Sequence, residues 1–482
     1  MLSGLEISEI LLSNVIQDNE KYRLDSEFFG KKFLEAYQKI KSINNTTIEK
    51  ELKVLTDFHS NGSYETISKN FKLLDEKDYA YMVRTTDLET NNFSEKVKYI
   101  SKSTYDFLSK SKVFGQEVLI NKIGSPGRTY IMPKLDMPVS LGMNLFLLRL
   151  KGKNIDENTL YLFLNSEIGR NIIQRKVNGT VPLTIDKKAI KSLYVPIFSY
   201  EFRSKLNNLI CTVNEKSKNA RLLYNQAENL LVCELGLENF EPSSEKVSIK
   251  TLKESFVKTG RLDSEYYQVK YDEYLQKIKL NKHTTISNEF ELIKEKMKNG
   301  LGSYNYIEIG DVNVSDGKSI PKLIDEKDLP ANAKIMPQKG DLLVSKVRPN
   351  RGAISIIEEN YSNLIVSGAF TVLREKEESD YKVETLKTLL RSPIYSDWLL
   401  KFNVGTSYPV IADEDILSLP IPIIKFNVQD KIVSYIKQSM EYSKKAKELL
   451  DISIRAVEIA IEKDEQTAQS FLDRQIDDNC LL

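Results

Sequence analysis

Histidine, cysteine and tryptophan are scarce in this chain: its 482 residues include two histidines, three cysteines and one tryptophan. The histidines, His59 and His283, have no partner at a metal-ligand spacing, which disfavours zinc chemistry and histidine-based acid–base catalysis. The cysteines (Cys211, Cys233 and Cys480) are too few and too scattered for a disulfide framework or a zinc site. We therefore expect no metal site in this chain.

Long apolar runs are missing as well. No run approaches the roughly 20 residues that span a bilayer, and the first residues lack the basic region and cleavage site of a signal peptide. With 41% hydrophobic and 28% charged residues, the composition is that of a globular protein. We expect a cytoplasmic protein without a membrane partner.

Neither sign of charge is in excess. The 69 Lys+Arg and 68 Asp+Glu residues give a net charge of +1. A protein that coats nucleic acid nonspecifically normally has a large basic excess, so this class is disfavoured. A site-specific reader whose positive charge is confined to one cleft remains compatible with the composition.

Catalytic signatures are lacking too. The chain has no Pro-Pro dipeptide, as in the Asn/Asp-Pro-Pro-aromatic motif of amino-methyltransferases, and no Gly-x-Gly-x-x-Gly after a strand. Segment 310–319 resembles a phosphate loop, but six residues separate its glycines instead of the required four, which favours a hairpin turn. Glu117 and Asp341 each lack the second acid that a metal-dependent nuclease needs, and we interpret them as flanking charge at a strand edge. The sequence predicts no catalytic residue.

What the chain does contain is two copies of one pattern. Matching segments follow in the same order: KYRLDSEFF (21–29) and TGRLDSEYY (259–267), GQEVLINKIGSPGRTYI (115–131) and GDLLVSKVRPNRGAISI (340–356), NGTVPLTIDKKAIKSLYVPI (178–197) and VGTSYPVIADEDILSLPIPI (404–423). Coincidence does not explain a collinear set of this kind. The sequence therefore predicts two homologous halves, about 1–246 and 247–482.

Each half changes character after its third matching segment. Short strand-like runs with turn signals, typical of a mixed α/β (α+β) domain, give way to a long helical stretch rich in Lys and Glu. We predict globular domains at 1–198 and 247–424, a helix within 199–246, and a helix with a C-terminal tail within 425–482.

The long helices each have a narrow apolar stripe. The first runs through Phe202, Leu206, Leu209, Val213, Ala220, Leu223, Ala227 and Leu230, and the second through Ile432, Ile436, Met440, Ala446, Leu450, Ile454 and Val457. Such a stripe must be buried, and we expect the two helices, each roughly 50 Å long, to pack antiparallel on each other. The alternative is that each helix folds back on its own domain.

Two loops combine arginine with glycine and proline directly after a buried strand, at 124–133 and 348–356. An arginine there can contact a guanine edge with two hydrogen bonds or clamp a phosphate, and the backbone N–H groups of the Gly-Thr turns can hold a phosphate. A solvated connection is the alternative for each residue alone. The candidate DNA-binding residues are Asn121, Lys122, Ser125, Arg128, Tyr130, Gly179, Thr180, Lys346, Arg348, Asn350, Arg351, Gly405 and Thr406.

Each half thus has RLDSE-aromatic, a mixed α/β domain, Gly-Thr…Pro…Ile-x-x-Leu-x-(Ile/Val)-Pro and a long helix. In this combination the whole chain resembles the specificity (S) subunits of type I restriction–modification systems. The resemblance implies two target recognition domains joined by two antiparallel, coiled-coil-like helices with a pseudo-twofold. Each domain is expected to read one half of a bipartite site in double-stranded DNA.

The resemblance also implies partners. Two modification (M) subunits are expected to carry S-adenosylmethionine and the methyl-transfer chemistry, restriction (R) subunits to add translocation and cleavage, and this chain to hold no cofactor. It is then a non-catalytic DNA-binding subunit that gives specificity to the complex. A single-chain restriction–modification enzyme, a stand-alone nuclease, or a scaffold subunit that does not read DNA remain the alternatives.

The two copies depart from symmetry at one place. Lys187-Lys188 in the first half is replaced by Asp413-Glu414 in the second. Phosphates would repel the acidic copy, so this helical turn faces solvent or a partner subunit, or the two halves sit differently on DNA. The acidic tail after about residue 463 is expected to fray or to contact a partner.

Overall fold

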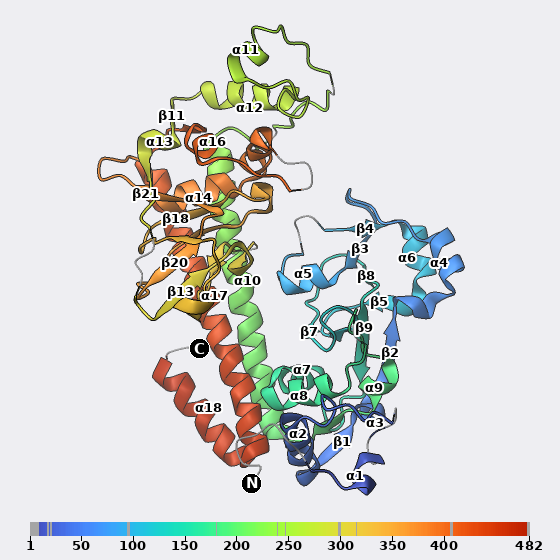
Figure 1. Ribbon diagram of the computed structural model, residues 1–482. Helices are drawn as coiled ribbons and strands as arrows, with labels where there is room; N and C mark the ends of the chain where they lie inside the picture. The colour runs from blue at the N-terminus through green and yellow to red at the C-terminus, as the bar shows by residue number, and fades with distance from the viewer. Residues whose placement is uncertain are drawn as a thin grey trace. The chain divides into compact units, whose positions relative to one another are not determined.

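The fold is taken from a computed structural model, which describes residues 9–16, 19, 22–93, 97–179, 181–238, 240–245, 247–296, 300–314, 316–404 and 408–479 (Figure 1). The chain divides into two compact units: unit 1 comprises Met1–Ser217 with Ser443–Leu482, and unit 2 comprises Lys218–Tyr442. Both boundaries fall inside long helices, and the four-segment division stays a prediction. Within the described ranges, no helix is both long and apolar enough to cross a membrane.

Among its described residues, unit 1 has two four-stranded sheets and one two-stranded sheet. The first sheet has the antiparallel order β2 (Leu52–Asp57), β9 (Leu145–Leu150), β6 (Val118–Asn121), β7 (Thr129–Ile131). The second has the order β4 (Tyr99–Ile100), β3 (Ala80–Val83), β8 (Val139–Leu141), β5 (Lys112–Val113), in which β3 and β8 are parallel. The short sheet pairs β1 (Asn45–Thr47) with β10 (Tyr194–Pro196).

Unit 2 repeats this plan. Its first sheet has the antiparallel order β12 (Phe290–Leu292), β21 (Phe370–Glu375), β18 (Leu342–Ser345), β19 (Ile354–Ile356). Its second has the order β16 (Lys322–Asp325), β13 (Ser303–Ile307), β20 (Leu364–Ser367), β17 (Ala333–Ile335), in which β13 and β20 are parallel. β11 (His283–Thr285) pairs with β22 (Pro420–Pro422). The recurrence of every order and direction confirms that the two halves are homologous and of mixed α/β fold.

One hairpin has no counterpart among the described strands of unit 1. β14 (Val312–Asn313) and β15 (Lys318–Ser319) pair antiparallel, and the Gly317 amide donates to Asn313 O across the turn. The segment that resembles a phosphate loop is therefore a hairpin, as predicted, although Ser315 lies outside the described residues.

The first sheet of each unit is buried on both faces. In β6, Val118 and Ile120 pack into a core with the helices, whereas Leu119 packs into a core with the second sheet. β18 alternates in the same way, with Leu342 and Val344 on one side and Leu343 on the other. An uninterrupted apolar run is what a strand needs when both its faces are covered. The turns that follow β6 and β18 therefore start from fixed positions.

Helices cover the outer face of each first sheet in equivalent places. The pairs are α2 (Lys31–Ser42) and α12 (Val269–Lys279), α7 (Glu157–Asn165) and α14 (Val383–Arg391), α8 (Glu167–Arg175) and α15 (Pro393–Trp398), α9 (Lys187–Lys191) and α16 (Asp413–Leu417). α7 begins at Asp156, whose side chain accepts the Thr159 amide, and α8 begins at Ser166, whose hydroxyl accepts the Gly169 amide. Such N-caps start a helix at a defined residue.

The two long helices, α10 (Tyr200–Glu234) and α17 (Phe426–Glu462), pack antiparallel in each unit (Figure 1). In unit 2 the Ser439 hydroxyl donates to Ala220 O at 2.7 Å, and Lys425 lies 3.8 Å from Glu234. In unit 1 the amide of Ser199, just before α10, donates to Glu465, just after α17, at 3.0 Å. The expected pairing is confirmed; the pseudo-twofold between the halves stays a prediction.

The apolar stripe of α17 is broader than its sequence indicates. Leu450 and Ile454 are half-buried, whereas Leu449 and Ala456 are fully buried. α18 (Glu465–Asn479) also packs into the core of unit 1. The helices that contact it therefore need a second apolar face.

The C-terminal tail was expected to fray or to contact a partner. The expectation of fraying is corrected, and contact with a partner stays a prediction. α18 buries Ala468 and Leu472 in the core of unit 1, and Asp473 forms an ion pair with Lys205 of α10. The acidic residues conceal an apolar face at helical spacing, and that face holds α18 in place.

Candidate nucleic-acid interface

The arginine-bearing loops occupy the same place in both units. We call residues 122–128, between β6 and β7, turn 1, and residues 346–353, between β18 and β19, turn 2. The Gly-Thr segments form motif loop 1 (177–186) and motif loop 2 (403–412), each leading into α9 or α16. Thr180, Gly405 and Thr406 lie outside the described residues, so the proposed phosphate turn stays a prediction.

Turn 1 and motif loop 1 lie side by side. The Gly124 amide donates to Leu183 O at 3.1 Å, and the Ile185 amide donates to Lys122 O at 3.0 Å. Gly179 is exposed, with a left-handed φ of 94°, and an added Cβ would lie 2.8 Å from Pro182 O. A side chain at Gly179 is therefore excluded by both conformation and contact.

Turn 2 and motif loop 2 repeat the contact. The Arg348 amide donates to Pro409 O at 2.7 Å, and the Ile411 amide donates to Lys346 O at 3.0 Å. Both units thus join the two segments that the sequence singled out for DNA contact into one surface.

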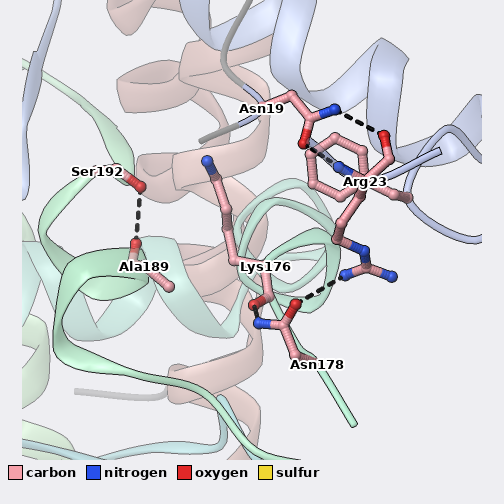
Figure 2. Close-up of a pocket in the computed structure, with 7 residues that line it drawn as sticks. Asn19, Arg23, Lys176, Asn178, Ala189 and Ser192 are labelled. Carbon is pink, nitrogen blue, oxygen red and sulfur yellow. Dashed lines mark hydrogen bonds between the residues drawn. The ribbon is translucent and has the colours of Figure 1, made fainter. Parts of the chain in front are cut away.

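Arg23 of the RLDSE motif fixes motif loop 1. Its Nη1 donates to Val177 O at 2.6 Å and approaches Asn178 Oδ1 at 3.4 Å, while an ion pair with Asp25 orients the guanidinium. The same guanidinium stacks on Phe28, 5.0 Å from the ring centroid. Figure 2 shows Arg23 reaching across a small pocket lined by Asn19, Arg23, Phe28, Lys176, Asn178, Ala189 and Ser192.

Arg261 does the same for motif loop 2. Its Nη2 donates to Asn403 O at 2.7 Å and its Nη1 to Phe402 O at 3.2 Å. It pairs with Asp263 and stacks on Tyr266, 4.6 Å from the ring centroid. This anchoring role of the RLDSE arginine was not predicted from the sequence, where the motif served only as a marker of the repeat. The recurrence of the motif ahead of both Gly-Thr segments was the signal that could have revealed this role.

Asp57, at the end of β2, ties turn 1 to helix α9. Lys122 Nζ lies 3.1 Å from Asp57 Oδ2, and Lys187 Nζ lies 2.7 Å from Asp57 Oδ1. Burial alone would raise the pKa of Asp57, but hydrogen bonds from Lys187, Ser60 and Lys122 lower it to about 2. The His59 Nδ1 atom accepts a hydrogen bond from Lys122 at 3.1 Å, and burial followed by the Lys122 charge lowers its pKa.

In unit 2 an ion pair of the opposite arrangement joins turn 2 to α16. Lys346 Nζ lies 3.0 Å from Asp413 Oδ1, and the Thr371 hydroxyl donates to the same oxygen at 2.6 Å. Asp413 stands where unit 1 has Lys187 in the sequence repeat. The asymmetry between the two motifs is therefore compensated inside each unit: Lys187 faces Asp57, and Asp413 faces Lys346.

The arginines take different positions within their turns. The Asn121 amide donates to Arg128 O at 2.9 Å, whereas the equivalent Ser345 amide donates to Ala353 O at 3.1 Å. Arg128 thus corresponds to Ala353, and turn 2 is one residue longer. The two arginine-bearing turns lie at the same place in both units, as expected. The individual arginines do not occupy equivalent positions within them.

Arg128 and Tyr130 share an acidic neighbour at the surface of unit 1. Arg128 Nη1 lies 2.8 Å from Glu89 Oε1, and the Tyr130 hydroxyl lies 3.5 Å from the same oxygen. Burial and the nearby Glu89 carboxylate raise the pKa of Tyr130 to about 12. Asn121 is buried and its Nδ2 donates to Ser125 O at 3.1 Å, which closes the turn and leaves Ser125 exposed.

The residues of turn 2 are arranged differently. Arg348 has a left-handed φ of 50° and stacks on Tyr408, 4.3 Å from the ring centroid. Its counterpart by backbone pairing is Gly124, for which such a φ carries no strain. A non-glycine residue in this region costs of order 1 kcal/mol or more and is frequent at functional sites. Asn350 is half-buried and Arg351 is exposed.

Arg391, the last residue of α14, supports turn 2 from behind. Its Nη1 donates to Gly352 O at 2.6 Å, its Nη2 to Val314 O of the hairpin at 2.8 Å, and its Nε to the Tyr224 hydroxyl of α10 at 2.9 Å. One side chain thus connects the turn, the hairpin and the long helix. No local sequence pattern predicts this contact, because all three partners are remote from Arg391 along the chain.

The two acids weighed as nuclease carboxylates are structural. Glu117 pairs with Arg149 at 2.9 Å and accepts the Phe114 and Gly115 amides, and Asp341 pairs with Arg374 at 2.8 Å. Both carboxylates are buried beside a strand, as the interpretation of flanking charge predicts.

The structure therefore sorts the described candidates into three groups. Asn121, Lys122 and Lys346 hold the turns together. Arg128, Tyr130 and Arg348 contact a neighbouring side chain but remain accessible. Ser125, Gly179, Asn350 and Arg351 lie at the turns or motif loops and belong to neither group. Lys122 is only 8% exposed, so its charge serves Asp57 rather than open solvent. Contact of any of these residues with DNA stays a prediction.

Comparison with known proteins finds similarity to type I restriction–modification specificity proteins. Residues 273–450 match the family described as Type I restriction modification DNA specificity domain. The Type I restriction enzyme HindI specificity subunit of Haemophilus influenzae is 33% identical over 113 residues. That alignment spans 23% of this chain and 24% of the relative, or about a quarter of the relative's length.

Two solved structures of such specificity subunits were also matched. The S subunit of a type I restriction–modification system from M. genitalium has 14% identity and a TM-score of 0.38, over 88% of this chain and 96% of that one. The HsdS subunit from Thermoanaerobacter tengcongensis has 12% identity and a TM-score of 0.27, over 87% and 97%.

The matched range 273–450 covers α12, both sheets of unit 2, motif loop 2 and the first part of α17. Unit 1 repeats these sheets and this loop, so the matched pattern occurs in both halves. Over residues 273–450 the chain therefore matches the DNA specificity domain of type I restriction–modification systems.

Proposed function

We propose that this chain is the sequence-specific DNA-binding subunit of a type I restriction–modification complex. Unit 1 and unit 2 each read one half of a bipartite target in double-stranded DNA, through turn 1 with motif loop 1 and through turn 2 with motif loop 2. Arg128, Arg348 and Arg351 supply base-edge or phosphate contacts, and the Gly-Thr segments add phosphate contacts.

One observation carries the proposal: both units join an arginine-bearing turn to a Gly-Thr loop by the same two backbone hydrogen bonds, between 2.7 and 3.1 Å long. Two equivalent surfaces with different side chains are what a two-part target of unequal halves requires. The match of residues 273–450 to a DNA specificity domain supports DNA as the ligand.

The chemistry then belongs to partner subunits. Two M subunits bind S-adenosylmethionine and transfer methyl groups, and R subunits translocate and cleave DNA, while this chain supplies no catalytic residue and no cofactor site. The antiparallel helices α10 and α17 set the spacing between the half-sites. With a net charge of +1, the chain binds DNA modestly by itself and relies on M subunits for further phosphate contacts.

Methylome sequencing tests the proposal. A host that expresses this chain together with a partner M subunit is expected to show methylation at a split motif with an undefined spacer, and no such methylation when either gene is deleted. A continuous motif would contradict the two-part reading. Methylation by this chain without an M subunit would favour a single-chain enzyme instead, and complex formation without any motif would favour a scaffold.

A further inference from the structure

Glu89 lies at the exposed end of turn 1 in a fixed position. It is the last residue of α5 (Thr85–Glu89), which follows strand β3. Thr85 Oγ1 donates to Asn121 Oδ1 at 3.4 Å at the start of α5. At its other end Leu88, next to Glu89, is buried in the core between the two sheets. The position of the Glu89 carboxylate relative to turn 1 is therefore set by the fold.

Glu89 and Arg128 form a paired donor and acceptor on an open surface. The Arg128 guanidinium lies 2.8 Å from the Glu89 carboxylate, with side chains 60% and 35% exposed. Nη1 of Arg128 donates this hydrogen bond to Oε1 of Glu89. A ligand at this surface meets guanidinium donors and a carboxylate acceptor next to each other.

Turn 2 offers no such pair within the part of the chain that the structure describes. Arg348 faces the ring of Tyr408, and Arg351 is exposed without a side-chain hydrogen bond or ion pair there. The acidic partner is thus specific to unit 1, which distinguishes the chemistry of the two surfaces.

A carboxylate beside an arginine selects a particular part of DNA. It repels phosphates and so weakens the use of Arg128 as a backbone clamp. In the major groove a G·C pair presents acceptors on guanine next to the amino donor of cytosine, and arginine pairs with the former while glutamate accepts from the latter. An A·T pair also presents acceptors and a donor, but its adenine amino donor lies between the two acceptors. Only a G·C pair presents two adjacent acceptors, guanine N7 and O6, to the arginine fork with a donor beyond them for the carboxylate. A phosphate presents no donor.

We propose that Glu89 is a specificity-determining residue of unit 1, which together with Arg128 binds the major-groove edge of one G·C base pair. This inference rests on the proposed function and adds to it the identity of one base pair in one half-site. Arg128 donates to the guanine and Glu89 accepts from the cytosine.

The test compares Glu89→Gln with Glu65→Gln in the full chain, each co-expressed with the M subunit and read by methylome sequencing. Glu65 is a matched control, because it pairs with Lys69 at 2.7 Å on an exposed helix of the same unit. Glu89→Gln is expected to relax one G·C position of one half-site by about tenfold or more, with the other half-site unchanged. Glu65→Gln is expected to leave the motif as it is.

Arg128→Lys supplies a second readout, because it keeps the charge and removes the guanidinium fork. It must relax the same base pair as Glu89→Gln. Relaxation at an A·T position, at different base pairs for the two variants, or in both half-sites would overturn the proposal, as would an unchanged Glu89→Gln motif. A wild-type chain that yields no split motif would instead overturn the proposed function itself.

Discussion

The ammonium group of Lys346 lies 3.0 Å from Oδ1 of Asp413, so turn 2 is joined to helix α16 by an ion pair inside unit 2. Unit 1 makes the equivalent connection from Lys122 and Lys187 to Asp57. The acid has moved from the helix to the end of a strand, and the lysine after the buried strand is the member that both units retain. Both units thus keep an ion-pair connection between the turn and the helix, although the acid lies on a strand in unit 1 and on the helix in unit 2.

Removal of the acid in unit 1 is expected to destabilise that unit. Asp57→Asn leaves Lys122, with a side chain only 10% exposed, without its charged partner. Breaking a buried pair by removing one partner costs on the order of 3–5 kcal/mol. Hydrogen exchange of the full chain measures this loss of stability. The peptides that contain β6 and α9 should exchange faster in the variant than in the wild type. Asp106→Asn is the control, because the Asp106–Lys112 pair is longer, at 3.8 Å, and more exposed.

The same variant carries a pH signature. Partners lower the pKa of Asp57 from its ordinary value of 3.8 to about 2. A lowered pKa means that the stabilisation is present above pH 3.8 and is lost as the pH falls towards 2. The difference in stability between wild type and Asp57→Asn should be full at pH 6 and shrink across that window. A difference that stays constant down to pH 2 would show that the Asp57 charge is not the cause.

The ion pair of unit 2 lends itself to charge reversal. Asp413→Lys sets two ammonium groups against each other where both side chains are 19% exposed, and it also removes the acceptor of Thr371. Lys346→Glu in the same chain restores opposite charges. We expect the double variant to recover about 1–3 kcal/mol relative to the sum of the single changes, as a double-mutant cycle in urea measures. Additive single effects would mean that the two residues do not interact.

Much of the architecture followed from the internal repeat. Two aligned copies of VLIN and LLVS, each before a Gly/Pro turn, located equivalent buried strands, and the a/d spacing from Phe202 onward located α10 and its need for a partner. These are local patterns of burial, and local patterns survive in a single sequence. The two halves could be aligned with each other, as two related sequences would be.

The partners of the charged residues could not be found in this way. Asp57 and Lys122 are 65 positions apart, and Arg391 contacts Tyr224 across 167 positions. Which residues meet depends on strand register and on how helices lie on the sheet, neither of which leaves a periodic trace. The one-residue difference between turns 1 and 2 was missed for the same reason, since it shows only in the backbone pairing of Asn121 and Ser345.

Loss of the RLDSE arginine is expected to loosen one motif loop and not the other. Arg261→Lys removes the bonds to Asn403 O and Phe402 O, and hydrogen bonds of charged groups contribute about 1.5–3 kcal/mol. Hydrogen exchange at Ile411 should accelerate, while that at Ile185 should not. Arg23→Lys is the matched variant and should reverse this pattern, because Arg23 holds Val177. Equal acceleration at both sites in either variant would contradict independent anchoring.

Arg391 is expected to act as a positioning residue for the half-site read by unit 2. Arg391→Lys keeps the charge but cannot hold Gly352 O, Val314 O and the Tyr224 hydroxyl together, so turn 2 loses its support. Methylation at degenerate sites of one half-site should rise about tenfold, equivalent to roughly 1.4 kcal/mol. Tyr224→Phe removes only the bond to α10 and should give a smaller change of the same kind.

The control for Arg391 comes from the other unit. Asn165 ends α7, as Arg391 ends α14, and its Nδ2 donates to Thr129 O beside turn 1 at 3.2 Å. Asn165→Ala should therefore relax the opposite half-site, and the two variants together should relax both. A general loss of stability would instead lower methylation at every site without changing the motif. Relaxation of both half-sites by Arg391→Lys alone would show that its effect is not confined to turn 2.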